Sequence, residues 1–152
     1  MNEESMDTVI KFTLKPIYKK YMHTLPEISI DWNENVVWAG PVEWDRTFEY
    51  DFRGREGVNS LGFKLINKQP NDTVMENEKI IADKAVIVEN ITIENFSFDS
   101  FQHQIRYKHN GETKQGNYIC WNNVRWELPI ELPVFTWIHK LENLGWIYGD
   151  TI

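Results

Sequence analysis

Apolar residues recur at every second position along most of this chain, which is the pattern of β-strands with one buried face. Residues 9–15 show it first, with Ile10, Phe12 and Leu14 on one side and polar residues on the other. Residues 84–101 are instead almost continuously β-branched and apolar, which predicts a central strand covered on both faces. The other alternating segments are residues 27–32, 36–38, 47–53, 59–67 and 126–132.

Two local signals complete the predicted architecture. The Asn110-Gly111 pair lies between residues 104–108 and 115–121, and Asn-Gly between two such segments predicts a tight hairpin. Residues 134–144 change to a period near 3.6, which predicts one C-terminal helix after Pro133. About eight short strands and a terminal helix predict a mainly-β fold, a two-sheet β-sandwich of jelly-roll type.

Domain organisation follows from length and composition. The chain has 152 residues, which suits a single domain. We expect a flexible acidic tail over residues 1–8 and one sandwich domain over residues 9–152. The acidic, polar start lacks the pattern of a signal peptide, and no apolar stretch is long enough to cross a membrane. A cytoplasmic protein with no membrane partner is the expectation.

Charge and cysteine content exclude several classes of function. The net charge is −7, from 16 Lys and Arg against 23 Asp and Glu, so a polyanion is repelled on average and nucleic acid is an unfavoured partner. The chain has a single cysteine, Cys120, whose apolar neighbours indicate a buried thiol that pairs with nothing.

Catalytic signatures are missing from the sequence. The four histidines match no zinc spacing, and there is no phosphate-binding loop or nucleophile elbow. Carboxylate pairs such as Asp45 with Asp51, or Asp31 with Glu34, would serve a glycosidase if the fold brought them within range. A solvated acidic surface explains them more simply. We therefore expect a protein that is not an enzyme.

The aromatic content of 14% is high, and two tryptophans stand apart from the predicted core. By strand parity Trp32 and Trp126 point inward, whereas Trp38 lies in a turn-rich connection and Trp121 precedes a polar stretch. Tryptophan rings beside planar amides and charges are typical of sugar-binding sites. The alternative is that both rings are buried against other parts of the fold. The predicted ligand-binding residues are Trp38, Trp121, Asn122, Asn123 and Arg125.

Residues 67–83 form a long polar excursion rich in oxygen ligands. A segment of this kind can hold Ca²⁺, which takes six to eight oxygens. The spacing lacks the glycine of an EF-hand, so a solvated loop is the simpler interpretation.

Two stretches resemble a known group of proteins. LGFKLINKQPNDTVMENEKIIADKAVIVENITIENFSF, residues 61–98, and ELPVFTWIHKLENLGWIY, residues 131–148, are similar to segments of small β-sandwich proteins encoded by tailed bacteriophages. Together the two segments cover about a third of the chain. Those proteins look like carbohydrate-binding modules of jelly-roll type, some of which bind sugar through Ca²⁺.

The resemblance implies a non-enzymatic virion protein, such as a decoration, neck or tail-associated protein, that docks onto other virion proteins or its own copies. It would assemble in the host cytoplasm. The alternatives are a carbohydrate-binding module that recognises a host surface glycan, with or without Ca²⁺, an enzyme acting on host polysaccharide, and a small cytoplasmic inhibitor of a host protein. If the likeness extends to calcium, the implied ligands are Asn67, Asn71, Asp72 and Asp83.

Overall fold

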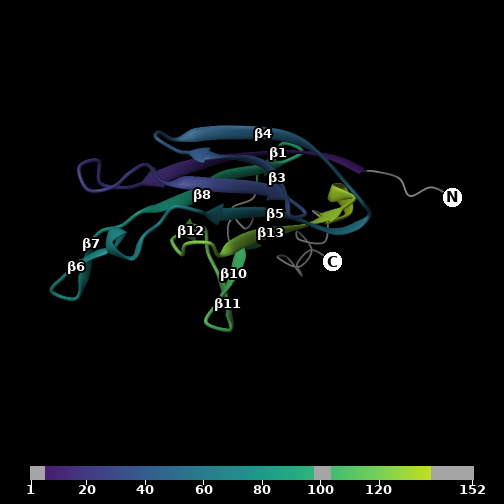
Figure 1. Ribbon diagram of the computed structural model, residues 1–152. Helices are drawn as coiled ribbons and strands as arrows, with labels where there is room; N and C mark the ends of the chain where they lie inside the picture. Colours follow the sequence, from purple (N-terminus) through teal and green to yellow (C-terminus); the bar gives the residue numbers. More distant parts are fainter. Residues whose placement is uncertain (1–5, 98–103, 138–152) are drawn as a thin grey trace, which may run out of the picture.

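The computed structural model describes residues 6–97 and 104–137. They form two antiparallel sheets stacked face to face, with a small hairpin projecting from one end (Figure 1). The first sheet has the order β12-β8-β1-β4, with β9 also paired to β8. Its strands are β1 Met6–Ile17, β4 Arg46–Gly54, β8 Ala85–Ile93, β9 Phe96–Ser97 and β12 Tyr118–Ile119.

The second sheet has the order β11-β10-β13-β5-β2-β3. The chain passes repeatedly between the sheets, so that strands close in sequence, such as β12 and β13, lie in different layers. The strands of this sheet are β2 Glu27–Trp32, β3 Asn35–Pro41, β5 Gly57–Leu65, β10 Arg106–His109, β11 Glu112–Gln115 and β13 Arg125–Leu132.

Alternate residues of the strands meet between the two sheets. Phe12 of β1 contacts Phe63 of β5 edge to face, with ring centroids 5.3 Å apart, and Trp32 of β2 stacks on Phe52 of β4 at 4.6 Å. These contacts join one sheet to the other, as in a packed sandwich core. Trp126 is also buried, so the predicted inward orientation of Trp32 and Trp126 is confirmed. The mainly-β, two-sheet sandwich is confirmed with it.

The N-terminal boundary differs from the expectation. β1 begins at Met6 and Thr8 is fully buried, so the strand includes residues 6–8 of the expected tail. At its other end β1 continues through Pro16. Its pairing with β4 ends at Leu14, while the pairing with β8 continues to Ile17. The missing N–H of Pro16 can therefore face the side that has no neighbouring strand.

The predicted hairpin turn and the start of the predicted helix are confirmed, but the second hairpin strand is Glu112–Gln115, since Tyr118–Ile119 of the expected segment 115–121 forms β12 in the first sheet. β10 and β11 pair around Asn110 and Gly111, both of which have positive φ. Helical backbone begins at Val134 and is described to Trp137, whose N–H donates to the carbonyl of Pro133 at 3.2 Å. The remainder of the predicted helix lies outside the described residues. No helix in the described ranges is long and apolar enough to cross a membrane.

The polar excursion is more ordered than a loop. It contains a 3₁₀ turn, η1 Pro70–Asp72, and a two-stranded hairpin of β6 Val74–Glu76 and β7 Lys79–Ala82. The residues between the two strands, Asn77 and Glu78, have φ of 53° and 65°, as in the type I′ turns that favour hairpins. This segment, together with β12, forms one end of the sandwich.

Candidate functional site

A cleft of about 660 Å³ opens at this end of the sandwich. We call it the aromatic cleft, because the exposed rings of Tyr118 and Trp121 line it beside polar side chains. The walls come from the polar excursion on one side and from β12 and the connection to β13 on the other. The lining residues are Lys68, Gln69, Pro70, Thr73, Ile80, Asp83, Tyr118, Cys120, Trp121 and Asn122.

The rings of Trp121 and Tyr118 are each held by contact with a different neighbouring residue. Trp121 is 43% exposed, and its indole stacks on the imidazole of His109 with ring centroids 4.0 Å apart and planes 12° apart. Tyr118 is 38% exposed, and its hydroxyl donates to Oδ2 of Asp83 at 3.2 Å. Because each ring is held by a neighbour, both are oriented before any ligand arrives, which lowers the entropic cost of binding.

Asp83 is the central acceptor of the cleft wall. Its Oδ1 accepts from Nζ of Lys68 at 2.6 Å, from the Thr73 hydroxyl at 2.7 Å and from the Lys84 backbone N–H at 2.9 Å. Lys68 also donates from Nζ to the carbonyl of Cys120 at 2.8 Å and from its backbone N–H to Oδ1 of Asn122 at 2.8 Å. Lys68 thereby joins the two walls of the cleft.

These contacts set the protonation states. Burial alone would raise the pKa of Asp83, but hydrogen bonds from Lys68 and Thr73, with the Lys68 charge, lower it below 3.8. Burial, followed by the charge of Asp83 and the hydrogen bond to it, raises the pKa of Tyr118 to about 12. Burial likewise raises the pKa of the half-buried Cys120 thiol. At neutral pH the cleft therefore presents a carboxylate, a neutral phenol and an unreactive thiol.

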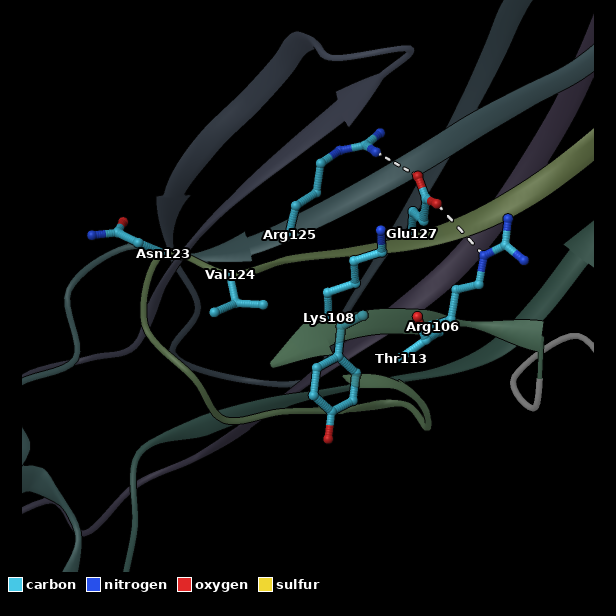
Figure 2. A pocket seen from close by; sticks show the side chains of 8 residues that line it. Arg106, Lys108, Thr113, Asn123, Val124, Arg125 and Glu127 are labelled. Atoms are coloured by element: carbon cyan, nitrogen blue, oxygen red, sulfur yellow. Dashed lines mark hydrogen bonds and ion pairs between the residues drawn. The ribbon is translucent and has the colours of Figure 1, made fainter. Parts of the chain in front are cut away.

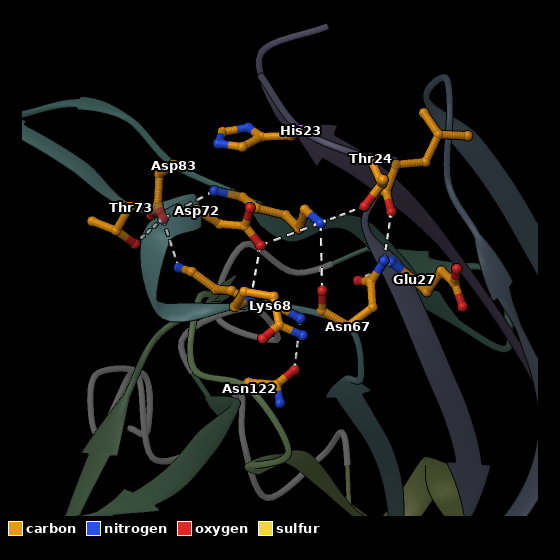
Figure 3. A network of polar contacts seen from close by, with 12 residues as sticks. His23, Thr24, Glu27, Asn67, Lys68, Asp72, Thr73, Asp83 and Asn122 are labelled. Atoms are coloured by element: carbon orange, nitrogen blue, oxygen red, sulfur yellow. Dashed lines mark hydrogen bonds and ion pairs between the residues drawn. The ribbon is translucent and has the colours of Figure 1, made fainter. Parts of the chain in front are cut away.

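A second lysine, Lys84, connects the polar excursion to the sandwich through Thr24, Asn67 and Asp72, which Figure 3 labels. Lys84 is 1% exposed, and its Nζ donates to the Thr24 hydroxyl at 2.8 Å and to the Asn67 carbonyl at 3.4 Å. The same Nζ lies 3.3 Å from Oδ2 of Asp72. That carboxylate also accepts from the backbone N–H of Gln69 at 2.7 Å. A buried ammonium is thus surrounded by oxygens from three segments of chain.

This arrangement bears on the calcium expectation. Ammonium groups of Lys84 and Lys68 already neutralise Asp72 and Asp83, and Oδ1 of Asn67 accepts from the backbone N–H of Glu27 at 2.8 Å. Asn71 is exposed on η1. In the described ranges no group of three acidic, His or Cys side chains could hold a metal ion. Asp72 and Asp83 are each paired with a lysine ammonium, which a bound Ca²⁺ would have to displace.

Asp83 is expected to make stability depend on acid pH. Its pKa is lower in the folded state, so its contribution is complete above the ordinary value of 3.8 and is lost as the pH falls through the folded value. We expect Asp83→Asn to destabilise the protein at about pH 6 and to have much less effect at about pH 2.5. Urea unfolding of both proteins across this range measures the difference. Asp51→Asn, at an exposed position of β4, is the control, and a pH-independent effect of Asp83→Asn would contradict the linkage.

A second cleft, of about 640 Å³, lies on the outer face of the second sheet (Figure 2). We call it the basic cleft, since Arg106, Lys108 and Arg125 contribute three cations against the single carboxylate of Glu127. Arg125 and Arg106 approach opposite oxygens of Glu127, at 2.8 and 3.6 Å. The remaining lining residues are Tyr107, Thr113, Asn123 and Val124.

Arg125 belongs to a structural ion pair as well as to this cleft. Its Nε donates to Oδ2 of the buried Asp31 at 2.9 Å, and a second guanidinium N–H donates to the Ser60 hydroxyl at 3.0 Å. The hydrogen bond to Asp31, opposed by burial, raises the pKa of Arg125 further. Asp31 Oδ1 also accepts from the backbone N–H of Glu34 at 2.9 Å. The carboxylate considered for a glycosidase pair is therefore bound to a guanidinium.

The five predicted ligand-binding residues are divided among three places. Trp121 and Asn122 line the aromatic cleft, and Asn123 and Arg125 line the basic cleft. Trp38 lies on β3, at the opposite edge of the second sheet from β10 and β11. Its ring contacts Phe48 at 4.9 Å, and the guanidinium of Arg46 lies 4.9 Å above it. Trp38 is therefore not a neighbour of Trp121.

Sequence reasoning missed several residues of the aromatic cleft. Tyr118 was not among the predicted ligand-binding residues, and Lys68, Gln69 and Thr73 come from a segment some fifty residues away in sequence. His109 was also missed, although it precedes the predicted Asn110-Gly111 turn and stacks on Trp121. The alternation of Tyr118 with buried Ile119 was the available signal for Tyr118, since neighbours in a strand face opposite sides.

Comparisons with known proteins give a fold-level likeness and no family. No family model matches the chain, and no curated protein matches it. A solved structure described as vCBM60 in complex with galactobiose has 9% identity and a TM-score of 0.48, over 80% of this chain and 99% of that one. A second solved structure is a selenomethionine form of vCBM60, described in connection with two families of calcium-dependent carbohydrate-binding modules. It has 9% identity and a TM-score of 0.45, over 80% of this chain and 89% of that one.

A likeness of this degree assigns neither ligand nor metal to this chain. Neither comparison supports the expected origin in a bacteriophage or a role in a virion. The ligand has to be inferred from the clefts.

Proposed function

We propose that this chain binds a glycan in the aromatic cleft and does not transform it. The observation that carries the proposal is the pair of exposed rings, Tyr118 and Trp121, held in one cleft with the polar groups of Lys68, Asp83 and Asn122. A sugar has an apolar face of C–H groups and a rim of hydroxyls. Flat rings bind the former, and fixed donors and acceptors bind the latter.

The polar groups of the cleft have hydrogen-bonding capacity left for hydroxyls. Asn122 uses Oδ1 to accept from Lys68, while no partner among the described residues takes its Nδ2. Asp83 and Lys68 are fixed by several contacts each, so their positions are set in advance. A preorganised cleft of this kind can bind a neutral, hydroxyl-rich ligand without rearrangement of the loops, so little entropy is lost on binding.

The first test is replacement of the stacking ring. We expect Trp121→Ala to weaken glycan binding by at least about tenfold, since loss of an aromatic contact of about 1.4 kcal/mol changes an equilibrium by that factor. A glycan array identifies the ligand, and isothermal titration calorimetry then compares the variants. The same titrations, followed by analysis of the sugar, check that the glycan is recovered intact.

Trp44→Ala is the matched control, because Trp44 is 72% exposed and lines neither cleft. It should leave binding unchanged. Glycan binding that survives Trp121→Ala with unaltered affinity would contradict the proposed site. A glycan array without signal for the wild-type protein would contradict the proposed function itself.

A further inference from the structure

We infer that the basic cleft binds the anionic groups of an acidic glycan, so that the ligand carries carboxylates or sulfates. This inference rests on the proposed function and names the class of glycan. The structure places Lys108, Arg125 and Lys64 at one level on three neighbouring strands. These three residues are called the cationic row below.

Strand register establishes the row. Arg106 of β10 is the partner of Glu127 of β13, and one level further along, the rings of Tyr107 and Trp126 stack at 3.5 Å. Continuing this antiparallel register brings Lys108 level with Arg125, and Figure 2 shows the two side chains rising from the same face. Arg125 is in turn the Cα partner of Lys64 on β5.

Parity places all three cations on the outer face. Lys64 lies between Phe63 and Leu65, which are both fully buried in the core, so its side chain projects to the opposite side. Arg125 and Lys108 are adjacent in sequence to Trp126 and Tyr107, the rings that stack between strands. Neighbouring strands are about 4.8 Å apart, so the row extends over roughly 10 Å.

A row of like charges is unfavourable unless something neutralises it. Like charges directly opposite each other on neighbouring strands destabilise a sheet. The charge of Arg125 is neutralised by Asp31 and Glu127, which lie two residue pairs further along the sheet. For Lys108 and Lys64 the described residues provide no carboxylate partner. In a chain with a net charge of −7, two uncompensated cations on either side of a third form a local site for anions.

The basic cleft adds neutral donors and adjoins the aromatic cleft. The Thr113 hydroxyl and the Asn123 amide line it beside the cations. Asn122 and Asn123 are consecutive but line different clefts, and His109, next to Lys108, stacks on Trp121. Because His109 and Lys108 project from opposite sides of β10, the two clefts meet only at the Asn122-Asn123 connection, and a polymer that contacts both has to cross that connection.

An acidic glycan fits these features better than a nucleic acid does. The mean field of the chain is negative, and binding to duplex DNA requires a wide basic surface that releases many counterions. Here the cations are few and lie beside a cleft with sugar-binding groups. Salt is nevertheless expected to weaken binding, since the ligand is charged.

The test compares glycans that differ only in charge. The probes are oligogalacturonate with its methyl-esterified form, and a sulfated galactan with its desulfated parent, each titrated at low and moderate salt. We expect at least one charged form to bind about tenfold more tightly than its neutral partner. Lys64→Gln combined with Lys108→Gln should abolish this preference and leave binding of the neutral form unchanged.

Lys11→Gln is the matched control, because Lys11 is exposed on β1 of the other sheet and its substitution makes the same kind of charge change. Equal affinity for both members of each pair would overturn the inference while leaving glycan binding through Trp121 intact. Tighter binding of an oligonucleotide than of either charged glycan would also overturn it. If no probe binds and the glycan array is silent, both the proposed function and this inference fail.

Discussion

Replacing Lys84 with alanine is expected to lower the free energy of unfolding by about 3 to 5 kcal/mol, which is the usual effect of removing one partner from a buried ion pair. Lys84 is 1% exposed, and its loss leaves the Asp72 carboxylate without its cation and the Thr24 hydroxyl without its donor. Thermal and urea unfolding, monitored by circular dichroism, measure the change.

The cause can be separated from loss of side-chain volume. Lys84→Met keeps much of the volume and should be nearly as damaging, because Asp72 remains buried and unneutralised. Combining Lys84→Met with Asp72→Asn should restore much of the stability, since the amide oxygen can still accept from the Gln69 N–H. Lys79→Ala, at an exposed position of β7, is the control. A double variant as unstable as Lys84→Met alone would show that the ion pair is not responsible.

Lys84→Ala should also weaken glycan binding. Lys84 is bonded to Thr24 and to the carbonyl of Asn67, and it follows Asp83, the central acceptor of the cleft wall. Loosening this junction adds an entropic cost to binding, because the cleft wall is no longer fixed beforehand. Calorimetry at a temperature where the variant is still folded separates this effect from unfolding.

The second large effect concerns Asp31 and Arg125. Asp31→Ala is expected to cost about 3 kcal/mol, because the largely buried guanidinium of Arg125 loses its buried carboxylate partner and keeps only Glu127 and Ser60. Arg125→Ala should cost a similar amount by leaving the buried Asp31 carboxylate uncompensated. The double variant should be much less destabilised than the sum of the two, and urea unfolding of all four proteins gives the coupling energy.

An additive result would show that the pair contributes no coupling and that the two residues act separately. The cationic row also gives Asp31→Ala a second expected consequence with the opposite sign. Removing this carboxylate increases the positive charge of the basic cleft, so the variant should bind an acidic glycan more tightly although it is less stable. Binding and unfolding measured on the same preparation distinguish the two effects.

Alternation alone was enough to predict β1, β2, β4, β5 and β13 and the faces that they bury. It did not predict β6 and β7, and the described part of residues 84–101 forms two strands, β8 and β9, rather than one strand covered on both faces. The segment 27–32 coincides with β2, and Ile28, Ile30 and Trp32 are buried as the pattern required. The physical reason is local: neighbouring residues in a strand face opposite sides, so one buried face specifies the whole segment. Asn110-Gly111 was sufficient for the same reason, since its backbone preference lies within the turn itself.

Other turns were missed because their residues are less distinctive. Asn33-Glu34, Asn77-Glu78 and Glu94-Asn95 all have φ between 53° and 70° and connect paired strands. Glutamate is an uncommon residue at positive φ, so these pairs carry no strong sequence signal. The hairpin of β6 and β7, which forms one wall of the aromatic cleft, was therefore interpreted as a polar loop.

The roles of individual polar residues were decided by tertiary structure. Asp72 and Asp83 have the composition of calcium ligands, but the fold places Lys84 and Lys68 against them. The ion pair of Arg125 and Asp31 lies across Gly62 of β5, the strand between β13 and β2. A Cβ at position 62 would overlap both the guanidinium of Arg125 and the carboxylate of Asp31, so the ion pair requires glycine there.

By itself the sequence determined the strands with regular alternation, their inward faces, the best hairpin turn and the start of the terminal helix, because each depends on residues near one another in the chain. Only the tertiary structure decided which loops share a cleft, that Trp38 and Trp121 lie apart, and which charges neutralise one another. Those outcomes depend on strand order and register, through which residues as distant as Asp31 and Arg125 become neighbours.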